Sequence, residues 1–268
     1  MSLSKKEEDF LLTMEQKGYF VFNSLEANTF WGCPGNTANA LSRLTHKKWL
    51  ERLTRGVYLI RSLEYRNKEF TKQTKFLIAS HLSQDAVVAY QSAMHFYGLK
   101  EASYNTNHFT VQTQHRKRSI QIHESYYHFI NINPEIFFDI RTIQLDTNAV
   151  LRITTPEKTL VDIAQRPDLC KDSSNILRFL QQFHSTFDWD HIDSIFLNHH
   201  YGPAIKRLGY LIEKFEIPIP NQKQRLASWQ NNLTQGVIQL EPKIKGHGHI
   251  HTRWSIEDNY FDKKESSK

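Results

Sequence analysis

Apolar residues in the first 60 positions recur first at helical spacing and then at strand spacing. Residues 5–16 place their apolar side chains on one face, which predicts a helix that Gly18 ends. A second, short helix is predicted to begin at residues 23–24, where either side chain can cap it, and to run through Ala27. The sequence WGCPG at residues 31–35 predicts a turn. Two helices and a turn therefore open the chain.

A third helix and a β-hairpin are predicted after this turn. The helix runs from Asn36 to Lys47, and its inward positions are small and apolar, namely Ala40, Leu41 and Leu44. Residues 50–53 and 56–60 predict two strands joined at Thr54-Arg55-Gly56. Three helices and a hairpin within about 60 residues are typical of a winged helix-turn-helix.

The remaining residues alternate between helical and β-rich patterns. Ser62–Lys68 is charged and polar without apolar periodicity, so a domain boundary is predicted there. Thr155-Pro156-Glu157 has the residue order of a helix start. Further helices are predicted at residues 70–82, 92–97, 173–184, 190–199 and 203–215, and β-rich runs at residues 87–90, 108–112, 119–132, 141–153, 236–241 and 249–255. The predicted class is α+β, with a winged helix-turn-helix DNA-binding domain at residues 1–62 and a larger mixed α/β domain at residues 69–260.

Composition indicates a globular protein of a reducing compartment. Hydrophobic residues make up 39% of the 268 positions, enough for a core, and the two cysteines form no disulfide or zinc pattern. No signal-peptide pattern or bilayer-length apolar run occurs, which predicts a cytoplasmic protein with no membrane partner. The net charge of +6 favours an anionic partner, and residues 35–62 contain six basic residues against Glu51 alone.

The polar face of the predicted third helix has side chains suited to reading DNA. The residues on or beside this face are Asn36, Thr37, Asn39, Ser42, Arg43, His46 and Lys47. Asn pairs with adenine and Arg with guanine in the major groove, whereas Lys and Thr hold phosphate. Arg52 and Arg55 lie in the hairpin, where a wing reaches the DNA backbone or the minor groove. An ordinary solvated helix face usually mixes charges, but no carboxylate occurs from Asn36 to Lys48, which favours double-stranded DNA as the partner.

Motifs for catalysis are weak. Asp188-Trp189-Asp190 has the spacing of the metal-binding pair in nucleotidyltransferases, but those enzymes place the pair after a Gly-Ser turn, and no Gly-Ser occurs in this chain. The two aspartates precede a helical pattern, so helix capping is the better interpretation. No P-loop, G-x-S-x-G or G-x-G-x-x-G sequence is present. The sequence therefore predicts a protein that is not an enzyme and has no cofactor.

Two histidine-containing segments have competing interpretations. His247, His249 and His251 alternate and could share a strand face that takes Zn²⁺, but neither carboxylate nor cysteine adjoins them in sequence and Glu257 is six residues on. A polar strand face is the preferred interpretation. The run His115–Arg118 is either a solvated turn or a second anionic contact.

Four segments, in this order and spacing, resemble the AbiEi-type antitoxins, the transcriptional regulators of abortive-infection toxin–antitoxin systems. The segments are Arg55-Gly56-Val57-Tyr58, Tyr90-Gln91-Ser92-Ala93 with Tyr97-Gly98-Leu99, Thr155–Asp162 and Arg207–Glu213. The resemblance implies a bacterial protein whose N-terminal winged helix-turn-helix binds inverted repeats in its own promoter. It also implies a larger domain that counters a co-encoded nucleotidyltransferase toxin. It assigns residues 36–47 and the Arg52–Arg55 wing to DNA contact.

Two other functions remain open from the sequence. One is a winged-helix nucleic-acid enzyme, and the other is a repressor that senses a metal or a small ligand through its C-terminal domain. The expected function is an antitoxin and autorepressor that acts without catalysis.

Overall fold

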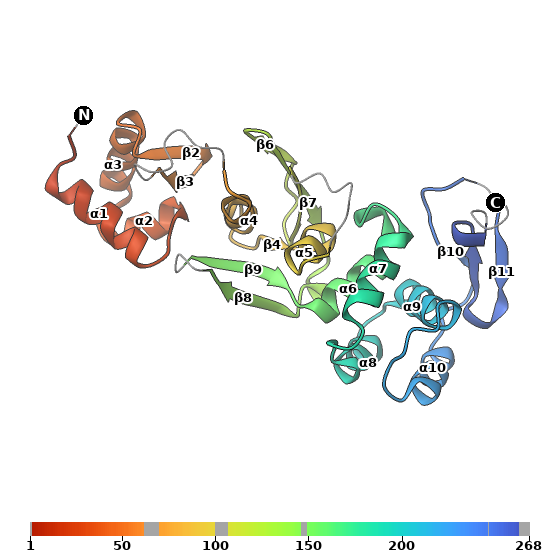
Figure 1. Cartoon of the computed structure of the whole chain (residues 1–268). Helices are drawn as coiled ribbons and strands as arrows, with labels where there is room; N and C mark the ends of the chain where they lie inside the picture. Colours follow the sequence, from red (N-terminus) through yellow and green to blue (C-terminus); the bar gives the residue numbers. More distant parts are fainter. Residues whose placement is uncertain (1, 62–69, 100–106, 146–148, 246, 263–268) are drawn as a thin grey trace. The chain divides into compact units, whose positions relative to one another are not determined.

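The chain has the predicted α+β fold, in which a winged helix-turn-helix precedes a larger mixed region. The computed structural model describes residues 2–61, 70–99, 107–145, 149–245 and 247–262 (Figure 1). The chain divides into two compact units. Unit 1 comprises Met1–Val88, Asn105–Ile132 and Ile140–Ile153, and unit 2 comprises Ala89–Tyr104, Asn133–Asp139 and Thr154–Lys268. The predicted boundary at Ser62–Lys68 lies outside the described residues, so the division at residues 1–62 and 69–260 stays a prediction.

Unit 1 begins with three helices whose ends follow from local capping chemistry. α1 (Lys5–Gln16) has the predicted bounds, and α2 (Ser24–Trp31) continues four residues past Ala27. α2 ends at Gly32, which has the positive φ of 80° that glycine adopts without strain. α3 (Pro34–His46) begins two residues before the predicted start, because Pro34 occupies the first helical turn, where its missing N–H costs nothing. The predicted turn at residues 31–35 therefore shrinks to two residues.

A three-stranded antiparallel sheet completes the winged helix. Its strand order is β1–β3–β2, formed by β1 (Val21–Asn23), β2 (Leu50–Thr54) and β3 (Val57–Ile60). The predicted hairpin is present, with a register shift between Arg52 and Thr54 and with Gly56 at a φ of 76°. The strand β1 was not predicted, since it has three residues and depends on pairing with β3.

One apolar core holds these helices and strands together. Phe10 of α1 is fully buried, and its ring lies 5.8 Å from that of Phe22, 5.3 Å from that of Phe30 and 5.5 Å from that of Trp31. The inward residues predicted for α3 are buried in the same core, which consists of Phe10, Leu11, Met14, Phe22, Ala27, Trp31, Ala40, Leu41, Leu44, Leu50 and Ile60. Packing of this core leaves the opposite side of α3 exposed to solvent.

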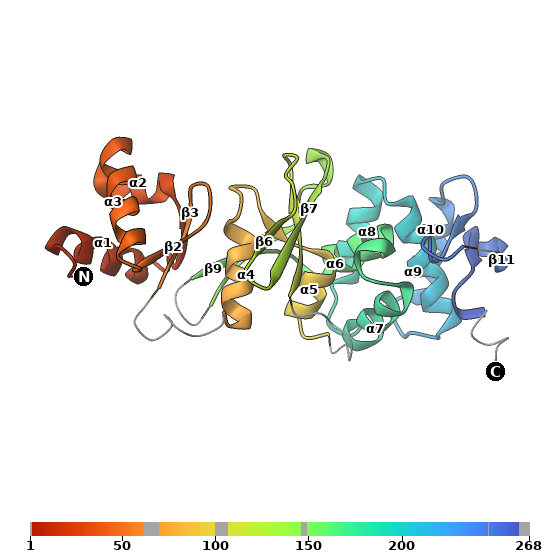
Figure 2. The same cartoon turned by 90° about the horizontal axis from the view of Figure 1, so that it is seen from above.

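The rest of unit 1 is a six-stranded mixed sheet with strand order β6–β7–β5–β4–β9–β8. Helix α4 (Lys72–His81) packs on β4 and β5, and the ring of Phe76 lies 5.1 Å from that of Phe109. Figure 2 shows α4 beside the sheet. The strands are β4 (Val87–Val88), β5 (His108–Thr113), β6 (Ile120–Ile122), β7 (Ser125–Asn131), β8 (Ile140–Gln144) and β9 (Val150–Thr154). The predicted β-rich runs at residues 119–132 and 141–153 thus each divide into two strands.

Unit 2 is mainly helical and is built around α6 (Pro156–Gln165). Thr155 caps α6 and Pro156 opens it, as predicted, and every residue from Lys158 to Ala164 is buried. The helices α5, α7, α8 and α9 all pack against α6. The remaining elements are α5 (Tyr90–Phe96), α7 (Ser173–Phe183), α8 (Trp189–Asn198), α9 (Gly202–Lys214), α10 (Gln222–Asn231), β10 (Ile238–Gln239), β11 (His249–His251) and β12 (Ile256–Asp258).

The segment Arg207–Glu213 of α9 has a packing role. Arg207 is buried and donates hydrogen bonds to the carbonyl oxygens of Leu240, Ala164 and Gln239 at 3.0, 2.9 and 2.7 Å. A Cβ at Gly209 would lie 2.2 Å from the buried ring of Trp254, so only glycine lets this ring approach the helix. These contacts tie the C-terminal residues to α9.

Candidate nucleic-acid interface

The exposed face of α3 contains most of the residues predicted to contact DNA. Asn36, Asn39, Arg43 and His46 are exposed, whereas Lys47 is half-buried. The same face also presents Ser42, which the sequence interpretation placed on or beside it, together with Gly35 and Ala38, which were not among the polar residues named for it. These small residues let the start of α3 approach a surface closely. The arrangement suits insertion of the helix into a groove.

Thr37 does not belong to this face, which corrects its predicted role. Its side chain is buried, and its Oγ1 lies 2.9 Å from both Asn28 Oδ1 and the Cys33 carbonyl oxygen. The hydroxyl can donate to either oxygen. Thr37 therefore ties α3 to α2 and has no free group for phosphate.

A carboxylate from α1 reaches the α3 surface, although the α3 segment itself contains none. Glu7 Oε1 accepts a hydrogen bond from Arg43 Nε at 3.3 Å, and Glu7 Oε2 accepts one from Lys47 Nζ at 2.7 Å. The side chain of Glu7 is only 2% exposed, whereas that of Arg43 is 56% exposed and that of Lys47 20%. The contact was missed because its partners are distant in sequence. The surface thus has an internal counter-charge that the sequence interpretation did not include.

The pKa of Glu7 reflects these partners. Burial alone would raise it, but hydrogen bonds from Lys47, Ser4 and Arg43 outweigh that effect and lower the pKa from 4.5 to about 2. Glu7 is therefore an anion at physiological pH, and its negative charge offsets the positive charge of Lys47.

We expect this lowered pKa to make the fold less stable in acid. A carboxyl group whose pKa is lower in the folded state stabilises the fold fully above pH 4.5 and loses that contribution as the pH falls toward 2. The loss should be on the order of 1–2 kcal/mol, since solvent around Arg43 screens the pair. Urea unfolding at pH 5.5 and pH 2.5 measures it. The Glu7→Gln variant should show a smaller acid-dependent loss, and an equal loss would contradict the assignment.

The wing provides two exposed cations. Arg52 and Arg55 are both exposed, and Arg52 Nε makes a 3.4 Å contact with the Thr54 carbonyl oxygen at the edge of hydrogen bonding. In the described part of the chain, Arg55 makes no ion pair. By contrast, Arg61 is paired with Glu51. Among the basic residues of the wing, Arg52 and Arg55 are therefore available to phosphate.

The basic run His115–Arg118 is partly held by contacts with other residues of unit 1. Asp85 Oδ2 accepts hydrogen bonds from the backbone N–H groups of Gln114 and His115 at 2.7 and 3.1 Å. Lys117 donates to the carbonyl oxygen of Leu82, while Arg116 and Arg118 are exposed. These contacts favour the structural turn over a second anion site.

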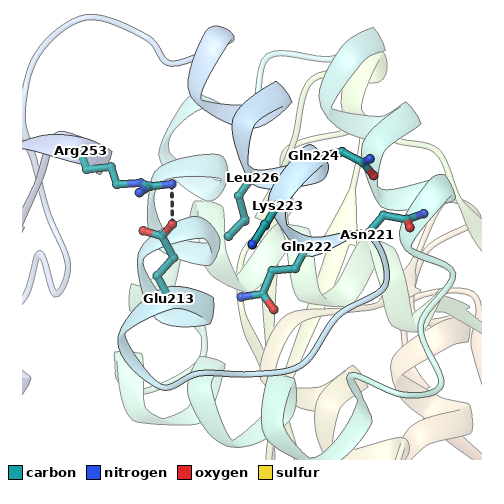
Figure 3. Close-up of a pocket in the computed structure, with 7 residues that line it drawn as sticks. All are labelled: Glu213, Asn221, Gln222, Lys223, Gln224, Leu226 and Arg253. Carbon is teal, nitrogen blue, oxygen red and sulfur yellow. Dashed lines mark ion pairs between the residues drawn. The ribbon is translucent and has the colours of Figure 1, made fainter.

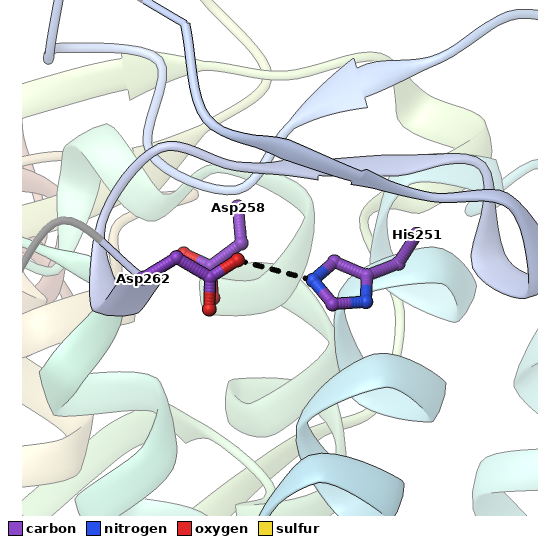
Figure 4. A group of neighbouring side chains, drawn as sticks. All are labelled: His251, Asp258 and Asp262. Carbon is purple, nitrogen blue, oxygen red and sulfur yellow. Dashed lines mark hydrogen bonds and ion pairs between the residues drawn. The ribbon is translucent and has the colours of Figure 1, made fainter. Parts of the chain in front are cut away.

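The predicted shared face is present for two of the three histidines near the C-terminus. His249 and His251 both lie in β11 with their ring centroids 4.8 Å apart, whereas His247 lies before this strand. His247 pairs with Glu257 at 3.1 Å, and His249 is exposed. His251 instead lies with Asp258 and Asp262 (Figure 4), and its Nε2 is 3.2 Å from Asp262 Oδ2. Carboxylates that are distant in sequence thus adjoin two of the histidines.

The group His251, Asp258 and Asp262 already contains a cation. The ammonium of Lys214 lies 3.0 Å from Asp258 Oδ2 and also pairs with Asp262. Burial opposes its charge, but these carboxylates raise the pKa of Lys214. A divalent ion would have to displace this ammonium, so the group serves first as an ion pair that closes the C-terminal residues on α9.

The other sequence motifs have structural partners. Asp188 caps α8, its Oδ1 accepting the backbone N–H of His191 at 3.0 Å, as predicted. Asp190 pairs with Arg225 at 2.8 Å instead of facing Asp188 across a metal site. A shallow cavity of about 630 Å³ in unit 2 (Figure 3) is bordered by Arg253, whose charge is neutralised by Glu213 at 2.8 Å. Its remaining lining residues are Asn221, Gln222, Lys223, Gln224 and Leu226.

Comparison with known proteins supports the resemblance over the winged helix. Residues 11–61 match the family model described as "Transcriptional regulator, AbiEi antitoxin". The whole fold is similar to the crystal structure of the RV2827C protein from Mycobacterium tuberculosis, with a TM-score of 0.63 and 13% sequence identity over 100% of this chain and 96% of that chain. The search of curated proteins found no match. In the described residues, no helix combines the length and apolarity needed to cross a bilayer.

Proposed function

We propose that the chain is an antitoxin and autorepressor that binds inverted repeats in its own promoter and counteracts a co-encoded nucleotidyltransferase toxin. One observation supports the DNA-binding part above all. The exposed Asn36, Asn39 and Arg43 lie on the outward face of α3, next in sequence to a wing that presents Arg55, within the segment that matches the regulator model.

In this proposal α3 enters the major groove, where each base pair presents a distinct pattern of donors and acceptors. The amide of Asn39 can donate to and accept from adenine, and the guanidinium of Arg43 can donate to guanine O6 and N7. Asn36 and His46 lie toward the two ends of the face and reach flanking bases or phosphates. Arg52 and Arg55 of the wing bind the backbone beside the groove.

Inverted repeats require two copies of the winged helix on one DNA site, because each half-site takes one recognition helix. The DNA-binding domain of the proposal is residues 1–62, and residues 69–260 form the part that counters the toxin in the bacterial cytoplasm. Support for the toxin comes from the description of the matched family model alone.

The wing gives a prediction on salt dependence. We expect Arg55→Ala to weaken binding to promoter and random duplexes by the same factor, and to reduce the slope of log K against log salt by about 1, because one phosphate contact is lost. Fluorescence anisotropy between about 50 and 200 mM salt measures the slope. Arg116→Ala removes another exposed arginine and serves as control. An unchanged slope, or a loss confined to the promoter, would remove the wing from the interface.

The two parts of the proposed function have separate tests. Titration of the duplex upstream of the gene against a random duplex tests promoter recognition, and equal affinity for both refutes it. Co-expression with the neighbouring gene tests toxin neutralisation, and unrelieved growth arrest in cells that contain both proteins refutes that part.

A further inference from the structure

Glu7 holds Arg43 by one edge of its guanidinium. The Nε–H of Arg43 donates to Glu7 Oε1, and within the described residues the guanidinium makes no other hydrogen bond. The two Nη groups are therefore directed away from this contact, on a side chain that is 56% exposed. These are the donors that match guanine O6 and N7 in the fork geometry of a bidentate contact.

Glu7 is itself held rigidly. Its Oε2 accepts the backbone N–H of Ser4 at 2.8 Å, and its own N–H donates to Ser4 Oγ at 3.4 Å, which together form the capping box of α1. The side chain is 2% exposed and packs at the junction of α1 and α3. A carboxylate whose Oε2 is held by the Ser4 N–H and by Lys47 can fix the rotamer of the arginine that its Oε1 binds.

We propose that Glu7 is a positioning residue that presets Arg43 to read one guanine, an inference that rests on the proposed DNA-binding function. If Arg43 is already held in the binding rotamer, less conformational entropy is lost when it binds guanine. The same carboxylate reduces the attraction between this surface and DNA phosphates, because its second oxygen pairs with Lys47, which is 20% exposed. Glu7 thus strengthens base reading and weakens non-specific attraction.

Positioning of Arg43 affects promoter affinity, whereas the charge of Glu7 affects affinity for all DNA. Measuring both duplexes therefore distinguishes a positioning role from a purely electrostatic one. Removing the charge of Glu7 should weaken binding to the promoter, where Arg43 meets its guanine. It should strengthen binding to random DNA, where Arg43 and Lys47 become two additional free cations. If Glu7 only repelled DNA, it would weaken wild-type binding to both duplexes, and removing its charge would strengthen binding to both.

The test compares Glu7→Gln with the matched control Glu8→Gln in the full chain. Glutamine keeps the capping box, and Glu8 is an exposed carboxylate one position away on the same helix. Glu7→Gln should lower promoter affinity about 5-fold and raise random-duplex affinity about 2-fold. The expected loss is only part of the about 1–3 kcal/mol by which a bidentate contact favours the correct base, because Arg43 itself remains. Glu8→Gln should change both affinities equally and slightly upward.

Substituting each G·C pair of the half-site in turn locates the guanine. Wild-type protein should lose the most affinity when one particular G·C pair is substituted. In Glu7→Gln, the loss at that pair should be much smaller. In an Arg43→Ala background, Glu7→Gln should leave discrimination unchanged, because Glu7 affects discrimination through Arg43. It should still strengthen binding to random DNA, because it also releases Lys47. Arg43→Lys keeps the charge without the fork and should also lose discrimination at that position.

Three results would overturn the inference. Equal tightening on both duplexes by Glu7→Gln refutes positioning while leaving promoter recognition intact. Retained guanine discrimination in Arg43→Lys shows that the fork is not used, whether or not Glu7→Gln folds well. Wild-type protein that binds promoter and random DNA equally refutes the proposed function and this inference together.

Discussion

Replacement of Arg43 by alanine is expected to weaken promoter binding about 10- to 100-fold, which corresponds to about 1–3 kcal/mol for one bidentate base contact. The guanidinium is the most versatile base-reading group on the exposed face of α3, and Glu7 fixes its inner edge. Affinity for random DNA should change far less, because in that complex Arg43 contributes charge only, already partly offset by Glu7. Preference among promoter variants should relax at one base pair.

Arg178→Ala is the matched control for this change. Arg178 is an exposed arginine on α7 of unit 2, so its removal alters the net charge equally without altering α3. Anisotropy titrations of both variants on promoter and random duplexes provide the comparison. An Arg43→Ala protein that still prefers the promoter as strongly as the wild type would show that another surface reads the sequence.

The second large effect is expected in unit 2, where Asp162→Ala should lower the free energy of unfolding by about 3–5 kcal/mol. Lys158 and Asp162 form a buried ion pair on α6, with both side chains almost fully inaccessible to solvent. The Lys158 ammonium also lies 5.0 Å from the centre of the Phe138 ring and 5.4 Å from that of Tyr201. Without Asp162 the ammonium loses its carboxylate partner in a region without water access.

Urea unfolding monitored by tryptophan fluorescence measures this loss. Asp168→Ala breaks a surface pair with Arg166 and should change stability by less than about 1 kcal/mol. Replacing both buried partners, as in Lys158→Met with Asp162→Leu, should restore much of the loss, because no unpaired charge remains. If the free energy of unfolding of Asp162→Ala lies within about 1 kcal/mol of the wild-type value, the buried ion pair does not stabilise unit 2 as expected.

Local sequence signals were sufficient to predict most of the winged helix. α1 has apolar side chains at helical spacing and a terminating glycine, so its bounds were predicted correctly. The start of α3 was predicted late, although Pro34 after Gly32 is a recognisable helix start. The strand β1 exists because β3 pairs with it, and three residues give no periodicity by themselves. Helix α10 was not predicted, because its sequence is mostly polar and only Arg225, Leu226 and Trp229 are buried.

The contacts that define the α3 surface depend on tertiary structure. Local spacing correctly placed Asn39 and Arg43 on an exposed face, but it also placed Thr37 there, whose hydroxyl is bound by Asn28 and Cys33. The partnership of Glu7 with Arg43 could not be predicted, because 36 residues separate the two and only packing of α1 against α3 brings them together. Similarly, His251 meets carboxylates only after the chain turns back through β12.

Methylation interference at guanine N7 is the most informative single experiment on the interface, because N7 lies in the major groove and is the acceptor that Arg43 is proposed to bind. Promoter DNA that is sparsely methylated is mixed with the full chain, and bound and free fractions are compared. We expect methylated guanine to be depleted from the bound fraction at one matching position in each half of an inverted repeat, and Arg43→Ala to abolish the depletion. Identical methylation patterns in bound and free DNA would contradict entry of α3 into the major groove.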